Sequence, residues 1–102
     1  MKVFWTKFAL NSLADIYKYF KENVSLIIAF NIRESVLTCT RQLEKHPLSG
    51  AKEEILEELG EGHRYLVRGN YKIIYKIHDK KVYITDVFDS RQDPEKIKQR
   101  NK

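Results

Sequence analysis

The hydrophobic pattern of this chain changes period once, near residue 62. Before that point apolar side chains recur three and four residues apart, and beyond it they alternate with polar side chains. The first spacing is typical of an amphipathic helix, and the second of a strand with one buried face. A chain of 102 residues has room for one compact domain with a single core. We therefore expect a single α+β domain over residues 1–102.

Two helices are predicted in the first half, because a polar capping residue precedes each helical stripe. Thr6 precedes a helix over about residues 7–22, and Ser25 precedes a second helix over 26–45. Pro47 ends the second helix, since proline cannot continue the backbone hydrogen bonding. The two helices are joined by only a few residues, which favours an antiparallel helical hairpin.

The second half predicts an antiparallel meander. Gly69-Asn70 and Asp79-Lys80-Lys81 have the composition of tight turns between three alternating runs, and the acidic stretch 53–62 is expected to be a loop with one helical turn. The helical hairpin is expected to pack on this sheet. The predicted strands are 2–5, 63–68, 71–78 and 82–88, and a last short helix is predicted over 95–100. In the middle strand the expected buried face carries Tyr71, Ile73, Tyr75 and Ile77, and the expected solvated face carries Lys72, Ile74, Lys76 and His78.

Several kinds of chemistry lack their usual sequence support. The chain contains no phosphate loop, no Gly-rich dinucleotide turn, no His-Glu-x-x-His and no cysteine pair, so we expect neither a cofactor nor a metal. Its one cysteine, Cys39, falls on the apolar stripe of the second helix and is predicted to be a buried structural thiol. His46 and His63 are expected to be ordinary residues at the ends of elements.

The location of the protein is predicted from two features. The longest apolar run, 26–30, is far shorter than the ~20 residues that cross a bilayer. Nothing near the N-terminus resembles a secretory signal. We expect a cytoplasmic protein that does not enter a membrane.

Positive charge is concentrated in the strand half. The formal net charge is +5, and residues 61–102 hold eleven basic and six acidic side chains. Such a surface attracts a polyanion or an acidic protein partner. Alternation places Arg64 and Arg68 on one side of their strand and Lys72 and Lys76 on one side of the next. If those sides coincide, the sheet presents a cationic face, next to Arg91, that could stabilise a phosphoryl-transfer transition state without a metal. Equally, these are ordinary charged strand residues that discourage edge pairing.

Several segments together resemble the RelE/ParE family of bacterial toxins. The resemblance covers nearly the whole chain and implies an antiparallel sheet with a helical hairpin packed on it. It also implies the toxin of a type II toxin–antitoxin module, of the kind that stabilises plasmids. The segments that carry it are Pro47-Leu48-Ser49-Gly50, Gly62-His63-Arg64-Tyr65-Leu66, Tyr71-Lys72-Ile73-Ile74-Tyr75-Lys76-Ile77 and the run from Val82 to Pro94 that contains Arg91-Gln92-Asp93-Pro94.

The resemblance leaves two mechanisms open. Relatives of the RelE kind cut mRNA in the ribosomal A site, and relatives of the ParE kind inhibit DNA gyrase. If the chain is a metal-independent endoribonuclease, the resemblance assigns catalysis to Arg64, Lys72 and Arg91. Contacts to nucleic acid would then come from Arg68, Lys76 and His78, with Lys72 or His78 assisting proton transfer. Nothing after Phe88 is aromatic or imidazole, although the nucleases commonly carry Tyr or His there.

The resemblance also implies a cognate antitoxin. We expect it to cover the toxin with a segment rich in Asp and Glu that contacts Lys72, Lys76 or Arg91, or else to bind only the helical hairpin. A third possibility is a degenerate, non-catalytic family member that acts only as a binding and co-repressor partner of its antitoxin.

Overall fold

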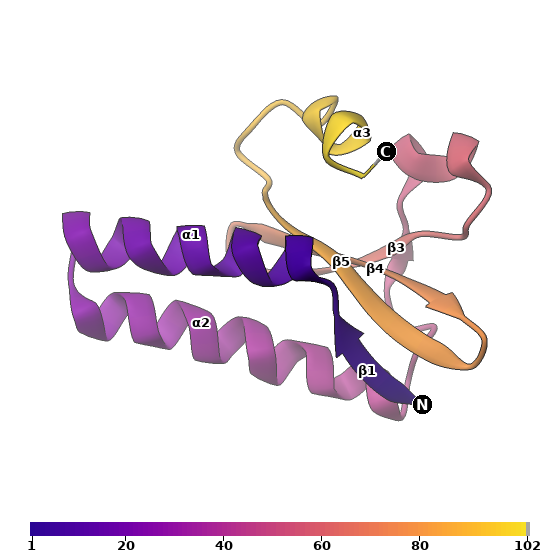
Figure 1. Cartoon of the computed structure of the whole chain (residues 1–102), viewed down its shortest axis with the longest axis horizontal. Helices are drawn as coiled ribbons and strands as arrows, with labels where there is room; N and C mark the ends of the chain where they lie inside the picture. Colours follow the sequence, from indigo (N-terminus) through magenta and orange to yellow (C-terminus); the bar gives the residue numbers. More distant parts are fainter. Residues whose placement is uncertain (102) are drawn as a thin grey trace.

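A five-stranded sheet with two long helices packed on one face forms the body of the molecule (Figure 1). The structure is a computed structural model, and it describes residues 1–101. The strands are β1 (Lys2–Trp5), β2 (Ala51–Lys52), β3 (Arg64–Arg68), β4 (Tyr71–His78) and β5 (Lys81–Asp89). The helices are α1 (Lys7–Asn23), α2 (Leu26–Arg41) and α3 (Lys96–Arg100), with 3₁₀ segments η1 (Gln42–Glu44) and η2 (Glu54–Leu59).

Both long helices begin at the caps that the sequence predicts. The Ala9 N–H donates to the Thr6 hydroxyl and the Ile28 N–H to the Ser25 hydroxyl, each at 3.1 Å. The predicted hairpin is confirmed, and α1 and α2 lie side by side (Figure 1). The second helix ends four residues earlier than predicted, at Arg41, where the chain tightens into η1.

The sheet has the strand order β1-β5-β4-β3-β2. The predicted meander is confirmed, because β3, β4 and β5 pair antiparallel through two tight turns. The prediction of a wholly antiparallel sheet is wrong at one edge, since β1 runs parallel to β5. No tight turn joins these two strands, because both long helices and three further strands, β2, β3 and β4, lie between them in the chain. Strand β2 was not predicted, because its two residues are too few to show an alternation of apolar and polar side chains.

Two-residue turns fix the register of the meander. Gly69 adopts a φ of +58° at the first central position of the β3–β4 turn. Asp79 and Lys80 both have positive φ, as a type I′ turn requires, and Lys81 already pairs with His78. The second turn is therefore one residue shorter than predicted.

Two hydrophobic clusters lie on opposite faces of the sheet. The main cluster joins residues such as Ile73, Tyr75 and Ile84 to the inner faces of α1 and α2. The second cluster contains Leu56, Ile74, Phe88 and Ile97. The expectation that the Ile74 face is solvated is thus wrong in its central part, because η2 and α3 cover it.

An irregularity in β5 changes which side chains share a face. Ile74 pairs with Asp86 and Tyr75 pairs with Ile84, so Thr85 is an extra residue on β5. Beyond this bulge Asp86 and Phe88 lie on the side of the second cluster, whereas Val87 faces the main cluster. No helix in residues 1–101 combines the length and apolarity that crossing a bilayer requires.

Candidate functional site

The strand register separates the basic residues that the sequence analysis grouped. Arg64 pairs with Tyr75 and Arg68 with Tyr71, so both arginines lie on the side of the helices. Lys72 and Lys76 alternate with these tyrosines and lie on the opposite side. The two pairs do not form one cationic face, and that hypothesis is corrected. The two-residue turn at Gly69-Asn70 is the cause, since it pairs the residues on either side of it.

The two arginines of β3 hold neighbouring segments in place. Arg64 donates from Nη1 to the carbonyl oxygens of Gly50, at 2.8 Å, and Leu48, at 3.4 Å. Arg68 donates from Nε to the hydroxyl of Ser35 on α2 at 2.8 Å. Both guanidinium groups therefore already have acceptors within the protein.

The loop that Arg64 holds is also fixed by Tyr75. The Gly50 N–H donates to the Tyr75 hydroxyl at 2.9 Å, and that hydroxyl donates to the Pro47 carbonyl at 2.7 Å. A Cβ at position 50 would lie 2.6 Å from the same hydroxyl oxygen, so only glycine fits there. Burial raises the pKa of Tyr75.

The two lysines of β4 are paired with acidic residues. Lys72 Nζ lies 3.0 Å from Glu53 Oε2 and 4.2 Å from the centre of the Tyr65 ring, and the Glu53 side chain is buried. Lys76 forms an ion pair with Glu61, whose pKa is lowered mainly by the hydrogen bond from this lysine. Neither ammonium group is free to serve an incoming phosphate without breaking a pair.

Arg91 lies just beyond β5 and is paired with Asp89. It donates from Nε to Oδ1 at 3.0 Å and from Nη2 to Oδ2 at 2.8 Å. This hydrogen bonding lowers the pKa of Asp89 and raises that of Arg91. His78 is exposed at the end of β4, and its side chain makes no hydrogen bond within residues 1–101.

Two other residues with reactive side chains are buried. Cys39 lies in the main cluster, and burial raises the pKa of its thiol, as predicted for a structural cysteine. His63 was expected to be a surface residue, but only 5% of it is exposed, because η2 and the preceding loop cover the start of β3. Burial lowers the pKa of its imidazole, and its Nδ1 has no hydrogen-bond partner within the described residues.

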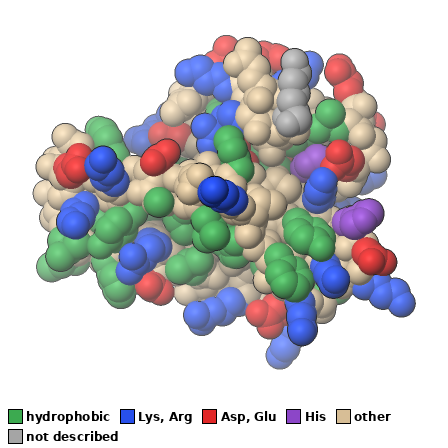
Figure 2. Space-filling model, viewed as in Figure 1, with side chains coloured by type: hydrophobic (Ala, Val, Ile, Leu, Met, Phe, Trp, Pro, Cys, Tyr) green, Lys and Arg blue, Asp and Glu red, His purple; other side chains and the backbone are tan. Residues whose placement is uncertain are grey.

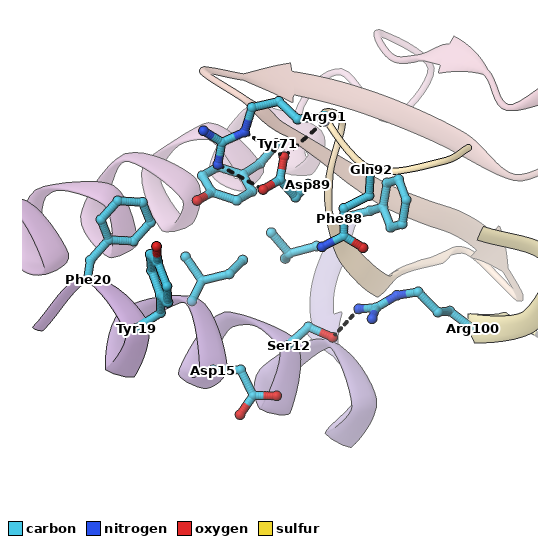
Figure 3. A pocket seen from close by; sticks show the side chains of 12 residues that line it. Ser12, Asp15, Tyr19, Phe20, Tyr71, Phe88, Asp89, Arg91, Gln92 and Arg100 are labelled. Atoms are coloured by element: carbon cyan, nitrogen blue, oxygen red, sulfur yellow. Dashed lines mark hydrogen bonds and ion pairs between the residues drawn. The ribbon is translucent and has the colours of Figure 1, made fainter. Parts of the chain in front are cut away.

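A charged cluster that the sequence analysis missed fixes α3. Arg100 donates from Nη2 to Asp86 Oδ1 at 2.7 Å and from Nε to Asp86 Oδ2 at 2.8 Å. The same Nη2 reaches the Ser12 hydroxyl of α1 at 3.0 Å (Figure 3). Asp86 has no exposed surface. In the sequence, the one sign that Asp86 is buried is its position within an apolar strand. Its partners Arg100 and Ser12 lie too far away in the chain to be predicted.

Two clefts lie beside each other at one end of the sheet. The first, with a volume of about 350 Å³, lies between α1 and the segment after β5 (Figure 3). The second, of about 510 Å³, lies between the helices and the β3–β4 turn. Phe20, Tyr71 and Arg91 line both clefts, so these three residues separate them.

The helical hairpin exposes a large apolar surface. Hydrophobic side chains gather over this part of the molecule (Figure 2). The most exposed is Ile27, at 73%. We call this set the hairpin patch, and it consists of Tyr19, Val24, Leu26, Ile27, Ile28 and Phe30. A concentration of exposed apolar side chains is typical of a surface that binds another protein.

Comparison with known proteins supplies a family and a fold. Residues 3–94 match the family model described as the ParE toxin of type II toxin–antitoxin systems, parDE. A solved structure titled as the chromosomal ParDE system from P. aeruginosa contains a chain with the same fold, at a TM-score of 0.73 and 19% identity. The alignment covers 87% of this chain and 95% of that one. No curated protein sequence matches.

Proposed function

The chain belongs to the ParE toxin family of type II toxin–antitoxin modules, and from this premise we propose that it arrests growth by binding DNA gyrase and not by cutting mRNA. The observation that carries the choice is the separation of the three residues to which cleavage would be assigned. Arg64 lies on the helix side of β3, Lys72 on the other side of β4, and Arg91 beyond the end of β5.

Metal-independent RNA cleavage needs its groups close together. One group must take the proton of the 2′-hydroxyl while others balance charge on the same phosphate, all within hydrogen-bond reach. Here each candidate donates to an acceptor of its own: Arg64 to backbone carbonyls, Lys72 to Glu53, and Arg91 to Asp89. The absence of Tyr or His after Phe88 points the same way. A toxin that inhibits by binding needs none of these groups.

A binding toxin does need an exposed surface that complements its target. The hairpin patch is the strongest candidate, because its side chains are apolar and stand outside the core. Burial of an exposed aliphatic side chain at an interface contributes about 1.5–3 kcal/mol. We place the contact with gyrase on this patch.

The same arrangement refines the expected antitoxin contact. Lys72 and Lys76 are paired within the toxin, so a partner that landed there would have to displace Glu53 or Glu61. The two clefts next to the hairpin combine apolar walls with Arg68 and Arg91 at their edges. We therefore place the antitoxin on the helical hairpin and these clefts, where it would mask the patch.

Two assays distinguish the mechanisms. In the first, the purified protein is added to gyrase with relaxed plasmid and to a translating extract. We expect loss of supercoiling and intact mRNA. Cleavage of mRNA at A-site codons without any effect on gyrase would overturn the proposal.

The second assay tests the patch in cells. Ile27→Asp places a charge on the most exposed residue of the patch, and we expect growth arrest to be lost. Leu48→Asp is the matched control, because Leu48 is also an exposed aliphatic residue, at 65%, but lies in the loop after α2. Arrest that survives Ile27→Asp as fully as Leu48→Asp would exclude the patch.

A further inference from the structure

Three side chains with unused hydrogen-bond donors line the first cleft, and two of them also line the second (Figure 3). Tyr71 is only 6% exposed, yet its hydroxyl makes no hydrogen bond within residues 1–101. Arg91 uses its backbone N, Nε and Nη2 on Asp89, and Nη1 remains unused. The Tyr19 hydroxyl on α1 has no partner in the described chain either. The Tyr71 hydroxyl is not cut off from solvent, so this donor is accessible to a ligand in the clefts.

The geometry of these donors is set by the sheet. Tyr71 and Asp89 are direct partners across β4 and β5, so their side chains lie next to each other on one face. Asp89 then holds the Arg91 guanidinium through two hydrogen bonds beside the Tyr71 ring (Figure 3). The forked donor is thus oriented before any ligand arrives.

The chemistry of the three donors selects an acceptor with negative charge. A guanidinium N–H and two hydroxyls suit the two oxygens of a carboxylate. The surroundings disfavour a nucleic acid, whose many phosphates need excess positive charge. Around the two clefts Arg68, Arg91 and Arg100 are matched by Asp15, Asp89 and the Asp86 that pairs with Arg100, so no excess positive charge is available for a row of phosphates.

The walls of the clefts suit a peptide. Apolar side chains flank the three donors on both sides. They are Ile16, Phe20 and Val87 in the first cleft, and Ile28, Ile32 and Val36 in the second. An amphipathic segment could bury apolar side chains on these walls and direct one acidic side chain at the point between them.

We propose that Tyr71, Tyr19 and Arg91 form a binding site for one Asp or Glu side chain of the antitoxin. The proposal rests on the placement of the antitoxin under the proposed function and adds the single charged contact that fixes the register of its segment. In the unbound toxin Asp89 accepts hydrogen bonds from two of the three side-chain nitrogens of Arg91. The incoming carboxylate would bind the remaining nitrogen, Nη1, so Arg91 would contact both carboxylates.

The test uses the full-length toxin and small probes, so it does not depend on growth arrest or on gyrase. N-acetylglutamate amide is titrated while backbone and Arg91 Nε signals are followed by NMR. Its neutral analogue N-acetylglutamine amide and inorganic phosphate are titrated separately. We expect the glutamate probe to shift Tyr71 and Arg91 signals with an affinity about tenfold above that of the glutamine probe, as one charge-assisted hydrogen bond implies. Equal affinity of the two would overturn the proposal, as would tighter binding of phosphate.

Variants separate a binding role from a structural one. Tyr71→Phe removes only the unpaired hydroxyl and should weaken the glutamate probe about tenfold without lowering stability. Tyr65→Phe is the matched control, because Tyr65 faces the second cluster, and it should leave binding unchanged. Asp89→Asn removes the competing charge but keeps a side-chain oxygen that can hold Arg91, so it should tighten binding. An unchanged affinity in Tyr71→Phe, or weaker binding in Asp89→Asn, would contradict the site.

Discussion

The two faces of the sheet are stabilised in different ways. The face toward α1 and α2 is closed by apolar packing over the whole length of β4 and β5. The opposite face has a small apolar cluster under η2 and α3, and beside it lie ion pairs that include a buried partner, Lys72–Glu53 and Arg100–Asp86. Packing is shared among many side chains, whereas each ion pair depends on two. The second face should therefore be the more easily disrupted by changes of charge, and the first by changes of volume.

The largest expected effect is a cavity in the main cluster. Ile73 and Ile97 are both fully buried, one in each cluster, and each can be replaced by Ala. Ile73→Ala should lower the free energy of unfolding by about 3–4 kcal/mol, since β4 is held on both sides and cannot collapse into the space. Ile97→Ala should cost about 2 kcal/mol, because the five-residue α3 can shift toward the cavity.

Urea unfolding followed by circular dichroism measures both values. The contrast depends on unchanged m-values, which show that the same surface is exposed on unfolding. If Ile97→Ala lowers the free energy of unfolding as much as Ile73→Ala does, the second cluster is as rigid as the first. The two faces would then not differ in their response to a cavity.

The next effect concerns the charged cluster under α3. Arg100→Met leaves the Asp86 carboxylate buried without its main partner. Loss of one partner of a buried pair costs about 3–5 kcal/mol, and the one-third exposure of Arg100 reduces our expectation to about 2–3 kcal/mol. Combining Arg100→Met with Asp86→Asn removes the unpaired charge and keeps an acceptor for Ser12. The double variant should recover more than half of the loss in the same unfolding assay, and no recovery would show that packing of Arg100 dominates.

The difference between the faces also explains what the sequence could predict. Helical and strand periods give the first face directly, because its apolar residues recur regularly along α1, α2 and β4. The second face is assembled from single residues such as Leu56 and Ile97, whose short segments have no period of their own. The parallel direction of β1 was likewise hidden, because no turn connects it to β5.

The arrangement of the candidate site was predicted less well than the fold, for a different reason. Alternation predicts which residues share a side within a strand, but the relation between strands depends on the turn. A two-residue turn at Gly69-Asn70 pairs Arg68 with Tyr71, and this signal was present in the sequence. The partners of Lys72 and Arg100 were not predictable, because Glu53 and Ser12 lie 19 and 88 residues away in the chain.

The two lysines of β4 differ in the burial of their acidic partners. Lys72→Met leaves buried Glu53 unpaired and should lower the free energy of unfolding by about 2 kcal/mol. Lys76→Met should change it by about 0–0.5 kcal/mol, because its partner Glu61 is largely solvated. Urea unfolding at low salt and at 1 M salt provides the check. Salt screens exposed charges more than buried ones, so it should reduce the stability loss of Lys76→Met but not that of Lys72→Met. Equal losses of unfolding free energy in the two variants would mean that burial of the acidic partner does not matter. A loss of toxicity in a Lys72 variant can be assigned to function only after its lower stability has been taken into account.

The smallest expected effect is a pH dependence from His63. Burial lowers the pKa of this imidazole, while Glu61 and Glu53 oppose the shift and Lys76 adds to it. The unfolded chain therefore binds a proton at a higher pH than the folded protein does. Stability is fully present above the unfolded pKa of about 6.5 and falls as the pH is lowered below it, by at most about 1.4 kcal/mol per pH unit.

His63→Leu removes both the titrating group and the buried Nδ1 that lacks a partner. Above pH 7 the variant should be as stable as the original or more stable by about 1 kcal/mol, because no polar atom is left unsatisfied. Between pH 6.5 and 5.5 the original protein should lose stability faster than the variant, as measured by urea midpoints at each pH. His78→Gln is the matched control, since His78 lies at the same end of the sheet but is exposed. If the urea midpoints of His63→Leu and of the original protein fall equally as the pH is lowered, His63 does not cause the sensitivity to acid. Protonation of the paired carboxylates would then cause it.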